Sequence, residues 1–299
     1  SAPMDTVTGA AMASIMWKHG ALGIIHRYNS ISEQCQLVRK TQASQNQRVG
    51  AAVGVSGDYL ERAIALAKAG IGILCVDVAH GHHVMMRHAL KTIRNTLGST
   101  VHVMAGNVAT LEGFDDLADW GADSIRVGIG GGSICSTRLQ TGHGQPTFSS
   151  VLDCAQSDRD ALLIADGGIR SAGDIVKALA AGADLVMVGS LLAGTEETPG
   201  KLYERRDGHS VKAYRGMASK EAQIEWRGRV SSDEGVSRFI PYKGSVRPIL
   251  KSLDKNIRSG LSYSGASTIL DLQVKAKFIR QTISAQVESS THVDLVKGG

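Results

Sequence analysis

Cysteine, proline and aromatic residues are scarce in this sequence of 299 residues. It has four cysteines and five prolines, and aromatic side chains make up only 4% of it. Such sparse cysteine use does not indicate a disulfide scaffold, and no two cysteines have the Cys-x-x-Cys spacing of a metal site. The hydrophobic core must therefore be built from Ala, Val, Ile and Leu. Cys35, Cys75 and Cys154 are expected to be core or helix residues, whereas Cys135 is an exception.

Long apolar runs and blocks of basic residues are also missing. The longest apolar runs, such as Ile71–Val76 and Leu185–Val188, are far too short to cross a bilayer, and no charged and then apolar leader opens the chain. Lys and Arg number 33 against 28 Asp and Glu, a net charge of +5, and the basic residues are spread along the chain. We therefore expect a cytoplasmic protein without a membrane or nucleic-acid partner, in which a few cations serve an anionic small molecule.

Alternating strands and helices dominate the chain from residue 49 onward. Short β-branched runs recur about every 20 to 30 residues with helical patterns between them, which is typical of successive βαβ units. The strands are expected at Gly23–Ile25, Val49–Val53, Ile73–Val76, Val101–Ala105, Ser124–Val127, Leu162–Ala165 and Leu185–Val188. The helices are expected at Thr8–His19, Ile31–Lys40, Asp58–Ala69, His83–Leu97, Thr110–Trp120 and Ala172–Ala181.

These seven strands are one fewer than a parallel (β/α)8 barrel contains. Ser1–Asp5 resembles the C-terminal tip of the remaining strand, so we expect an α/β TIM barrel whose first strand lies largely before Ser1. An open doubly wound sheet is the alternative, but no Gly-x-Gly-x-x-Gly follows these strands in a short turn into a helix. No Pro-rich linker divides residues 1–299, so we expect one domain. After the last strand we expect an active-site flap at about residues 217–243 and a tail with a terminal helix.

A glycine-rich loop, residues 126–138, follows one of the expected strands. It reads Arg-Val-Gly-Ile-Gly-Gly-Gly-Ser-Ile-Cys-Ser-Thr-Arg and contains Cys135. Because glycine lets the backbone approach a ligand closely, this loop suits amides that contact a phosphate or carbonyls that surround a cation. Arg138 and oriented amides near the thiol favour a nucleophilic Cys135. The alternative is a flexible glycine loop with an incidental cysteine.

Two later strand ends predict an anion site. Asp166 and Gly168 follow one strand, and Gly189 and Ser190 follow the next, at the position where barrels bind phosphate after strands seven and eight. An ionised Asp166 has two acceptor oxygens for sugar hydroxyls. The structural alternative is that Asp166 caps the Ile169–Ala181 segment.

Asp77 and Asn107 end two adjacent strands, so both are candidates to face a second ligand. His80, His82 and His83 follow closely. Because sequential histidines diverge at a helix start, their spacing does not favour a metal site.

Together these motifs resemble the IMP dehydrogenase/GMP reductase family, from Ser1 to about Arg280. The resemblance rests on Ser1–Val7, the Cys135 loop, Asp166–Ile169, Gly189–Gly194, Tyr214–Met217 and Arg258–Gly260. It implies an oxidoreductase of purine metabolism, in which Cys135 forms a thioether-type adduct at C2 of a purine nucleoside monophosphate. It also implies a homotetramer, the usual assembly of the family.

The resemblance further implies roles for individual residues. It places Asp166 on the ribose and Met4, Met217 and Ala218 along the base. The residues that it places around the 5′-phosphate are Ser133, Gly168, Gly189, Ser190 and Tyr214. At the nicotinamide cofactor it places Asp77, Asn107, Arg126 and Gly128, and at the K⁺ site of dehydrogenases the carbonyls of Gly130, Gly132 and Cys135. The family usually has a bulkier residue at position 131, so Gly131 predicts a more mobile loop and an altered cation site.

Two activities in this family share the covalent step and differ in the next one. The dehydrogenase oxidises IMP with NAD and hydrolyses the adduct to XMP, with a water that an Arg-Tyr pair on a long flap activates. The reductase expels ammonia from GMP and accepts hydride from NADPH. Here the flap is short and contains Trp226–Arg229 without an Arg-Tyr pair. Thr137 and Glu234 match the residues with which reductases protonate the departing amine.

We therefore expect a GMP reductase that uses NADPH. IMP dehydrogenase with NAD is the alternative, and a non-catalytic barrel that binds purine nucleotides is an alternative of another class. The CBS regulatory modules of dehydrogenases are missing after Ile31–Lys40, as they are from many reductases. Ser1–Val7, His80–Gly81 and Asp166–Asp184 resemble dehydrogenases more closely. The flap outweighs these segments because it performs the step in which the two reactions differ.

Overall fold

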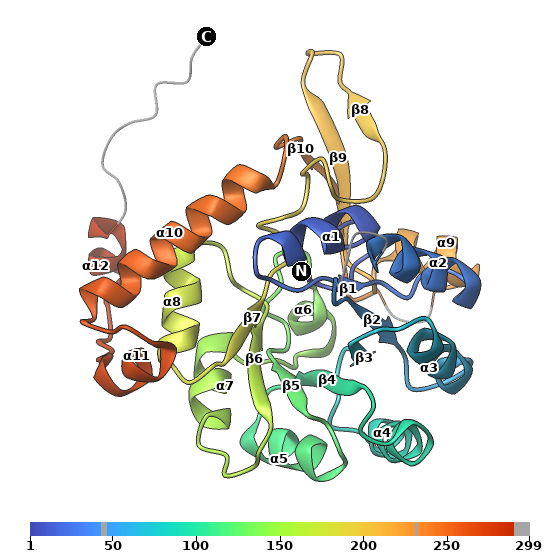
Figure 1. The fold of residues 1–299 in the computed structure, drawn as a ribbon. Helices are drawn as coiled ribbons and strands as arrows, with labels where there is room; N and C mark the ends of the chain where they lie inside the picture. The colour runs from blue at the N-terminus through green and yellow to red at the C-terminus, as the bar shows by residue number, and fades with distance from the viewer. Residues whose placement is uncertain (43–46, 231–232, 290–299) are drawn as a thin grey trace.

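The computed structural model describes residues 1–42, 47–230 and 233–289. Seven parallel strands pair in chain order, from β1 to β7, in one curled sheet (Figure 1). They are β1 (Ile24–Ile25), β2 (Gly50–Val53), β3 (Ile73–Asp77), β4 (His102–Val108), β5 (Ser124–Val127), β6 (Leu162–Asp166) and β7 (Leu185–Met187). All seven lie where the sequence predicts strands.

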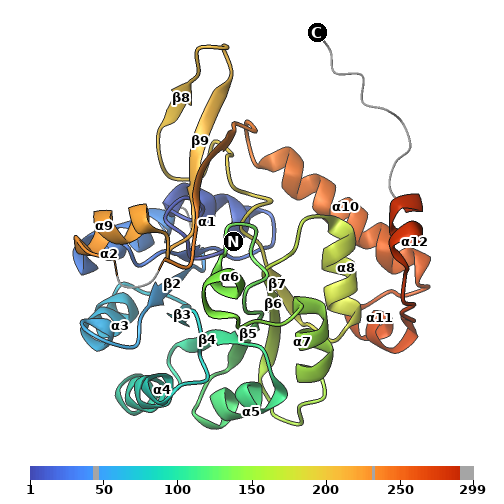
Figure 2. The same ribbon diagram turned by 180° about the vertical axis from the view of Figure 1, so that it is seen from behind.

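Six helices predicted from the sequence are also present, and they surround the sheet (Figures 1 and 2). They are α1 (Ala10–Lys18), α2 (Ile31–Gln42), α3 (Tyr59–Lys68), α4 (Val84–Leu97), α5 (Leu111–Asp119) and α8 (Ala172–Ala180). Side chains of His83, Thr110 and Ser171 accept main-chain N–H groups at the starts of α4, α5 and α8. These caps satisfy donors that a helix start leaves unpaired, and so fix where each helix begins.

The interior of the curled sheet is filled by side chains from six of its strands and from residue 2. One buried cluster contains Ala2, Ile24, Ala52, Cys75, Met104, Ile164 and Met187. Ile24 N donates to Ser1 O at 3.3 Å, and Ala2 N donates to Val188 O at 3.0 Å. The main chain of residues 1–2 therefore lies between β1 and β7, at the position predicted for the remaining strand, although these residues are not assigned as a strand. This arrangement is that of a TIM barrel.

Several elements were not expected from the sequence. They are α6 (Thr137–Thr141), α7 (Thr147–Cys154), α9 (Lys220–Arg227) and an antiparallel sheet of β8 (Leu202–Glu204), β9 (Ser210–Arg215) and β10 (Ser237–Pro241). The β9–β10 pair places Arg215, just before the flap, opposite Ser237 within it. Pairing between segments so far apart in the chain leaves no local periodicity to detect.

The tail, in which a terminal helix is expected, contains three helices in its described part. After β10 the chain forms α10 (Arg247–Tyr263), α11 (Ile269–Lys275) and α12 (Ile283–Glu288). α10 packs on α8 at Gly260, where a side chain would lie 2.6 Å from Val176 Cγ2. Gly260 therefore allows the two helices to approach closely.

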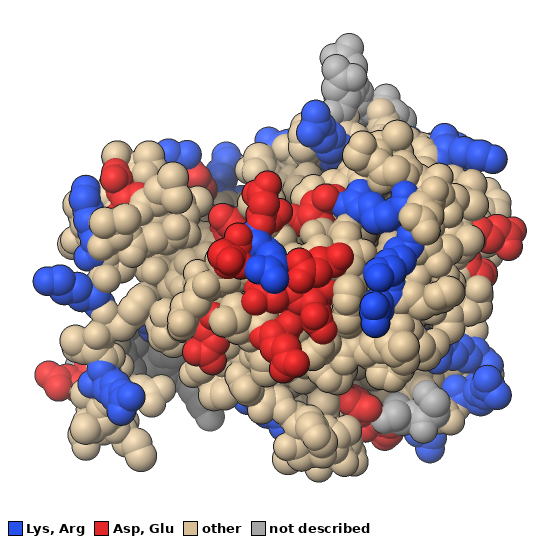
Figure 3. All heavy atoms as spheres, turned by 90° about the horizontal axis from the view of Figure 1, so that it is seen from below, with Lys and Arg blue, Asp and Glu red and all other residues tan. Residues whose placement is uncertain are grey.

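Charge is distributed unevenly over the surface. One face gathers acidic side chains around a single basic residue (Figure 3). Arg159 forms ion pairs with Asp119 and Asp158. Asp115 and Asp116 lie with Asp119 on helix α5. Within the part of the chain that the structure describes, no helix combines the length and apolarity needed to span a membrane.

Candidate active site

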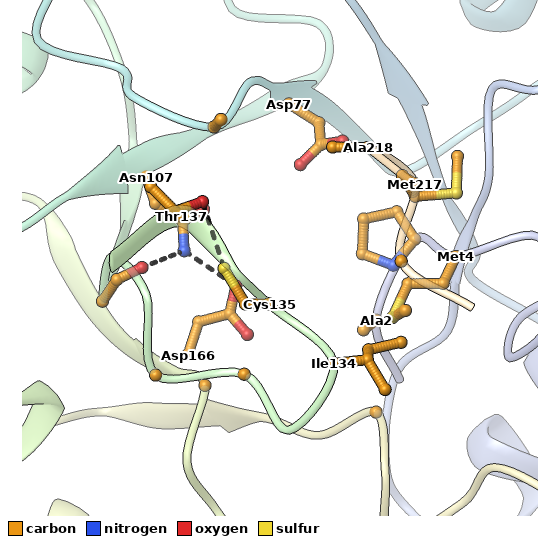
Figure 4. A pocket seen from close by; sticks show the side chains of 18 of the residues that line it. Ala2, Met4, Asp77, Asn107, Ile134, Cys135, Thr137, Asp166, Met217 and Ala218 are labelled. Carbon is orange, nitrogen blue, oxygen red and sulfur yellow. Dashed lines mark hydrogen bonds between the residues drawn. The ribbon is translucent and has the colours of Figure 1, made fainter. Parts of the chain in front are cut away.

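A pocket of about 420 Å³ lies at the carboxyl ends of the barrel strands. Every residue that the sequence analysis places in a site lines this pocket, from Met4 to Glu234. Figure 4 shows Cys135 near its centre, with Asn107 and Asp166 on the barrel side and Met4 and Met217 across from them. The predicted nucleotide, cofactor and catalytic sets therefore form one continuous site.

The glycine-rich loop between β5 and α6 is packed closely against its neighbours. Gly128 has a φ of 142°, and a side chain there would lie 1.9 Å from the Asp166 carbonyl oxygen. Only glycine fits this position. At Gly131 a side chain would lie 2.4 Å from Thr147 Oγ1. The bulkier residue that is usual in the family would therefore clash here, which gives Gly131 a packing role.

Cys135 is the one exposed cysteine among the four, all of which lie in the described part of the chain. Its Sγ lies 3.2 Å from Thr137 Oγ1, which in turn donates to Glu234 Oε2 at 2.9 Å. By contrast, burial raises the pKa of Cys75 to about 11 and that of Cys154 to about 12, so both remain protonated thiols near neutral pH. Accessibility and partners therefore distinguish Cys135 as the candidate nucleophile.

Main-chain pairing carries Glu234 to the cysteine loop. Cys135 and Gly235 form an antiparallel bridge, Ser136 N donates to Glu234 O at 2.9 Å, and Val236 N donates to Ile134 O at 3.0 Å. Glu234 follows its partner Thr137 by 97 residues. The flap therefore completes the pocket by pairing with the loop that carries Cys135.

Arg126 is buried beneath the pocket and joins two of the predicted ligand-binding carboxylates. Nη1 donates to Asp77 Oδ1 at 2.7 Å, and Nε and Nη2 donate to Asp166 Oδ2 at 3.1 and 3.0 Å. Asn107 Nδ2 donates to the same Asp166 oxygen at 2.9 Å. Burial opposes the charge of Arg126, but nearby Cys75, Asp77 and Asp166 raise its pKa well above the ordinary value. This network fixes both carboxylates in the pocket.

Asp166 remains available to a ligand through its second oxygen. No described residue donates to its Oδ1, whereas Oδ2 accepts from Arg126 and Asn107. The capping alternative is wrong, because the side chain that caps α8 is Ser171. The barrel thus holds one carboxylate oxygen in place, and the other can accept a hydrogen bond from a ligand.

The residues expected at the 5′-phosphate gather at one end of the pocket. Ser133 Oγ and Tyr214 Oη lie 3.4 Å apart. The main-chain N–H groups of Gly168 and Ser190 donate to no described residue, so both are free to bind an anion. Burial raises the pKa of Tyr214, which keeps its hydroxyl a donor. The chemistry at this end suits phosphate.

Four polar pocket residues were not predicted, namely Arg27, Tyr28, Gln223 and Arg227. Arg27 Nε lies 3.9 Å from Asp77 Oδ2. Tyr28 Oη donates to Met217 O at 2.6 Å, and its ring stacks on Trp226 with centroids 5.6 Å apart. Arg27 and Tyr28 come just after strand β1, as Asp77 comes at the end of β3. This position after a strand could have identified them from the sequence. Gln223 reaches the pocket only because the flap docks there.

Arg138 does not face the thiol in the manner expected. Its guanidinium donates to the carbonyls of Ile129, at 3.5 Å, and Gln145. A side chain at Gly130 would lie 2.7 Å from Arg138 Nε, and the Gly132 carbonyl accepts the Cys135 N–H at 3.1 Å. The Arg138 side chain therefore packs beside Gly130, whose carbonyl is one of the three expected to bind K⁺.

The histidines after β3 have separate partners. His82 Nε2 lies 2.8 Å from Asp116 Oδ2, and His83 caps α4. In residues 1–42, 47–230 and 233–289, no group of three or more His, Cys, Asp or Glu side chains is arranged to hold a metal ion.

Known proteins that are similar in sequence to this chain are all IMP dehydrogenases or GMP reductases among those compared below. The model of the IMP dehydrogenase / GMP reductase domain matches residues 1–292. An inosine-5′-monophosphate dehydrogenase from Nitrosopumilus maritimus (strain SCM1) is 46% identical over 260 residues, which are 82% of this chain and 54% of that protein. A GMP reductase from Leishmania major is 47% identical over 257 residues, again 82% of this chain and 52% of that protein. The chain thus spans about half the length of these relatives.

The fold is similar to that of a solved enzyme. A crystal structure of GMP reductase from Trypanosoma brucei in complex with guanosine 5′-monophosphate matches with a TM-score of 0.92 and 30% sequence identity. The match covers 98% of this chain and 90% of that one.

Proposed function

Because this chain belongs to the IMP dehydrogenase/GMP reductase family, we propose that it is a GMP reductase, which converts GMP, NADPH and a proton into IMP, NADP⁺ and ammonia. The observation that carries this proposal is the row of Cys135 Sγ, Thr137 Oγ1 and Glu234 Oε2, with successive separations of 3.2 and 2.9 Å. It joins a nucleophile to a proton donor. Removal of an amine from a covalent adduct requires both.

The proposed reaction starts when the Cys135 thiolate forms a bond to C2 of the guanine base. Glu234, acting through the Thr137 hydroxyl, delivers a proton to the exocyclic amine, and the C2–N bond breaks to release ammonia. The bound dinucleotide supplies a hydride to C2. The C2–S bond then breaks, its electron pair returns to the Cys135 sulfur, and IMP leaves.

The remaining pocket residues position the nucleotide. Ser133, Tyr214 and the free N–H groups of Gly168 and Ser190 bind the 5′-phosphate. Asp166 binds the ribose through Oδ1, since its other oxygen is held by the barrel. The purine lies against three small or flexible apolar residues on the other side of the pocket, namely Met4, Met217 and Ala218.

The residues expected at the nicotinamide cofactor suit such a ligand. Asn107 Oδ1 is buried and has no hydrogen-bond partner among the described residues. A buried acceptor without a donor is costly, and an amide or hydroxyl of the dinucleotide would satisfy it. We place the dinucleotide against Asp77, Asn107, Arg126 and Gly128.

IMP dehydrogenase is the second candidate. The observation in its favour is Arg227, which lines the pocket from the flap helix α9 and is our candidate for activating a water. The reductase has the stronger support, because Glu234 is already bonded to the side chain next to the nucleophile. The same row of three residues argues against a barrel that only binds nucleotides.

The test is to incubate the protein separately with GMP plus NADPH and with IMP plus NAD, and to quantify IMP, ammonia and XMP. We expect IMP and ammonia in equal amounts from the first mixture, together with the loss of NADPH absorbance. Sustained XMP production without GMP consumption would overturn the reductase proposal. Binding of GMP with no turnover in either mixture would support the non-catalytic alternative.

A further inference from the structure

A second cavity, of about 620 Å³, adjoins the active-site pocket, and we call it the side cavity. Three residues that we place at the 5′-phosphate, Ser133, Gly168 and Ser190, line both cavities. A phosphate bound by these residues therefore borders the side cavity as well as the pocket. The proposed reaction gives this second space no role.

The wall of the side cavity is rich in positive charge. Arg138, Arg170 and Lys177 line it, and Asp174 is the acidic residue among them. The Arg138 guanidinium is bound to main-chain carbonyls, but among the described residues Arg170 and Lys177 form no ion pair. Two cations thus remain available to a ligand, and an anion is the ligand that they favour.

Unused hydrogen-bond donors lie along the same wall. Thr147 Oγ1 is buried and has no partner among the described residues, and a side chain at Gly168 would lie 3.8 Å from it. The N-cap residue of α7, Pro146, provides no side-chain cap. The hydroxyl thus lies close to the turn that we place at the 5′-phosphate, and a buried hydroxyl without a partner is costly. This hydroxyl is buried behind the loop, so an oxyanion in the side cavity would pair with the cations that line it.

We propose that the side cavity binds a phosphate group, and that this group is the β-phosphate of a purine nucleoside diphosphate whose α-phosphate occupies the 5′-phosphate site. The placement of the nucleotide rests on the proposed function. Its consequence is that GDP competes with GMP for the enzyme. A high concentration of GDP then slows the reduction of GMP.

The test is a titration of GMP and GDP, by calorimetry, into the wild type and three variants. In Arg170→Ala/Lys177→Ala we expect GDP to bind at least about tenfold more weakly, since a charge-assisted hydrogen bond contributes about that factor or more. GMP should bind within about threefold of the wild type, because the β-phosphate is the group that the two cations contact. The control Arg205→Ala/Arg206→Ala removes the same charge from the exposed β8–β9 turn and should change neither affinity.

Asp174→Asn gives a test of opposite sign. It removes a negative charge from the cavity and keeps an acceptor for the Arg170 N–H, which Asp174 Oδ2 accepts at 3.0 Å. GDP should therefore bind a few-fold more tightly to this variant, and GMP should bind as it does to the wild type. Weaker binding of GDP would contradict the proposal.

Three further results would overturn the proposal. Equal losses of GMP and GDP affinity in Arg170→Ala/Lys177→Ala would show that the two cations act on the 5′-phosphate itself. Binding of inorganic phosphate or pyrophosphate that depends on Arg170 and Lys177, with GDP no tighter than GMP, would show a site for free phosphate. No loss with any of these probes would show that the cavity binds none of them. If the wild type fails to bind GMP, the proposed function fails, and the pyrophosphate titration still decides whether the cavity holds an anion.

Discussion

The two sides of the active-site pocket are built in different ways. On the barrel side, Arg126 and Asn107 are buried and tied to strand-end carboxylates by several short hydrogen bonds. On the flap side, Glu234 is half-buried and Arg227 is exposed, and both belong to a segment that reaches the pocket by pairing with the cysteine loop. In the reaction that we propose, the barrel side holds the nucleotide and the flap side supplies the proton donor.

This difference suits a family that includes both IMP dehydrogenase and GMP reductase. In the reaction that we propose, the covalent step uses the barrel loop that carries Cys135, and the next step uses the residues that the flap brings beside it. Segments with few buried contacts open at lower free-energy cost than a packed core. Changes on the flap are therefore expected to alter the fate of the adduct without unfolding the barrel.

Loss of the nucleophile should produce the largest effect. Cys135→Ala should abolish turnover, while GMP affinity stays within about tenfold of the wild type, because the phosphate and ribose contacts provide most ground-state binding. Steady-state assays and calorimetry measure the two quantities. Cys35→Ala removes a buried thiol from α2 and should remain active. Near-normal turnover by Cys135→Ala would remove the residue from the mechanism.

Asp166 tests the barrel side. Asp166→Ala should weaken GMP binding at least about a hundredfold, because two charge-assisted hydrogen bonds to the ribose contribute about 1.5–3 kcal/mol each. The dissociation constant and KM both report this loss. Asp158→Ala, which removes an exposed carboxylate from another face, is the control. An unchanged dissociation constant and KM would refute the ribose assignment.

Glu234 tests the flap side. General acid catalysis typically contributes about 10²–10⁴-fold, so Glu234→Gln should slow GMP reduction by about that factor. Formation of the Cys135 adduct from IMP should continue, because that step does not release an amine. Mass spectrometry of the intact protein detects the adduct. Glu221→Gln, on the exposed side of the same flap, should have normal kinetics, and an equal defect in both variants would argue against a specific role for Glu234.

The contact between Tyr28 and Trp226 tests how the flap is held. Trp226→Ala removes a stacked aromatic pair that contributes about 0.5–1.5 kcal/mol. The flap should open more often, and kcat for GMP reduction should fall about two- to tenfold, with GMP affinity unchanged. Tyr263→Ala removes an aromatic ring that is 92% exposed and serves as the control. A kcat equal to that of the wild type would show that the stack does not hold the flap.

His26 gives a smaller, pH-dependent effect. Burial lowers the pKa of His26, an effect that Asp5 opposes and Arg215 reinforces, so the folded protein resists its protonation. The unfolded chain binds this proton below its ordinary pKa of about 6.5, and stability should therefore fall as the pH drops below that value. His26→Gln should lose less melting temperature between about pH 7.5 and about pH 5.5 than the wild type and than the exposed control His19→Gln. Equal losses in all three proteins would exclude His26 as the source.

Local patterns predicted the barrel and the residues at its strand ends, and the family resemblance implied most of the other residues that line the pocket. β-branched runs and caps mark strands and helices, and parallel strands deliver the residues after their ends to one face of the barrel, as with Asp77 and Asp166. The flap contacts depend on pairing between Cys135 and Gly235, which local periodicity does not encode. The direction of Arg138 depends on its rotamer, so its carbonyl contacts were not predictable either.

The stability of the Cys135 adduct toward water is the most direct test of the account. The enzyme is mixed with IMP and NADP⁺, the reduced dinucleotide is removed, and the protein mass and released nucleotides are followed with and without added ammonium. We predict that the adduct persists in water and yields GMP when ammonium is added, because Glu234 and Thr137 handle an amine and the described flap residues include no Arg-Tyr pair. Rapid release of XMP in the absence of ammonium would contradict this account, and would identify the chain as an IMP dehydrogenase.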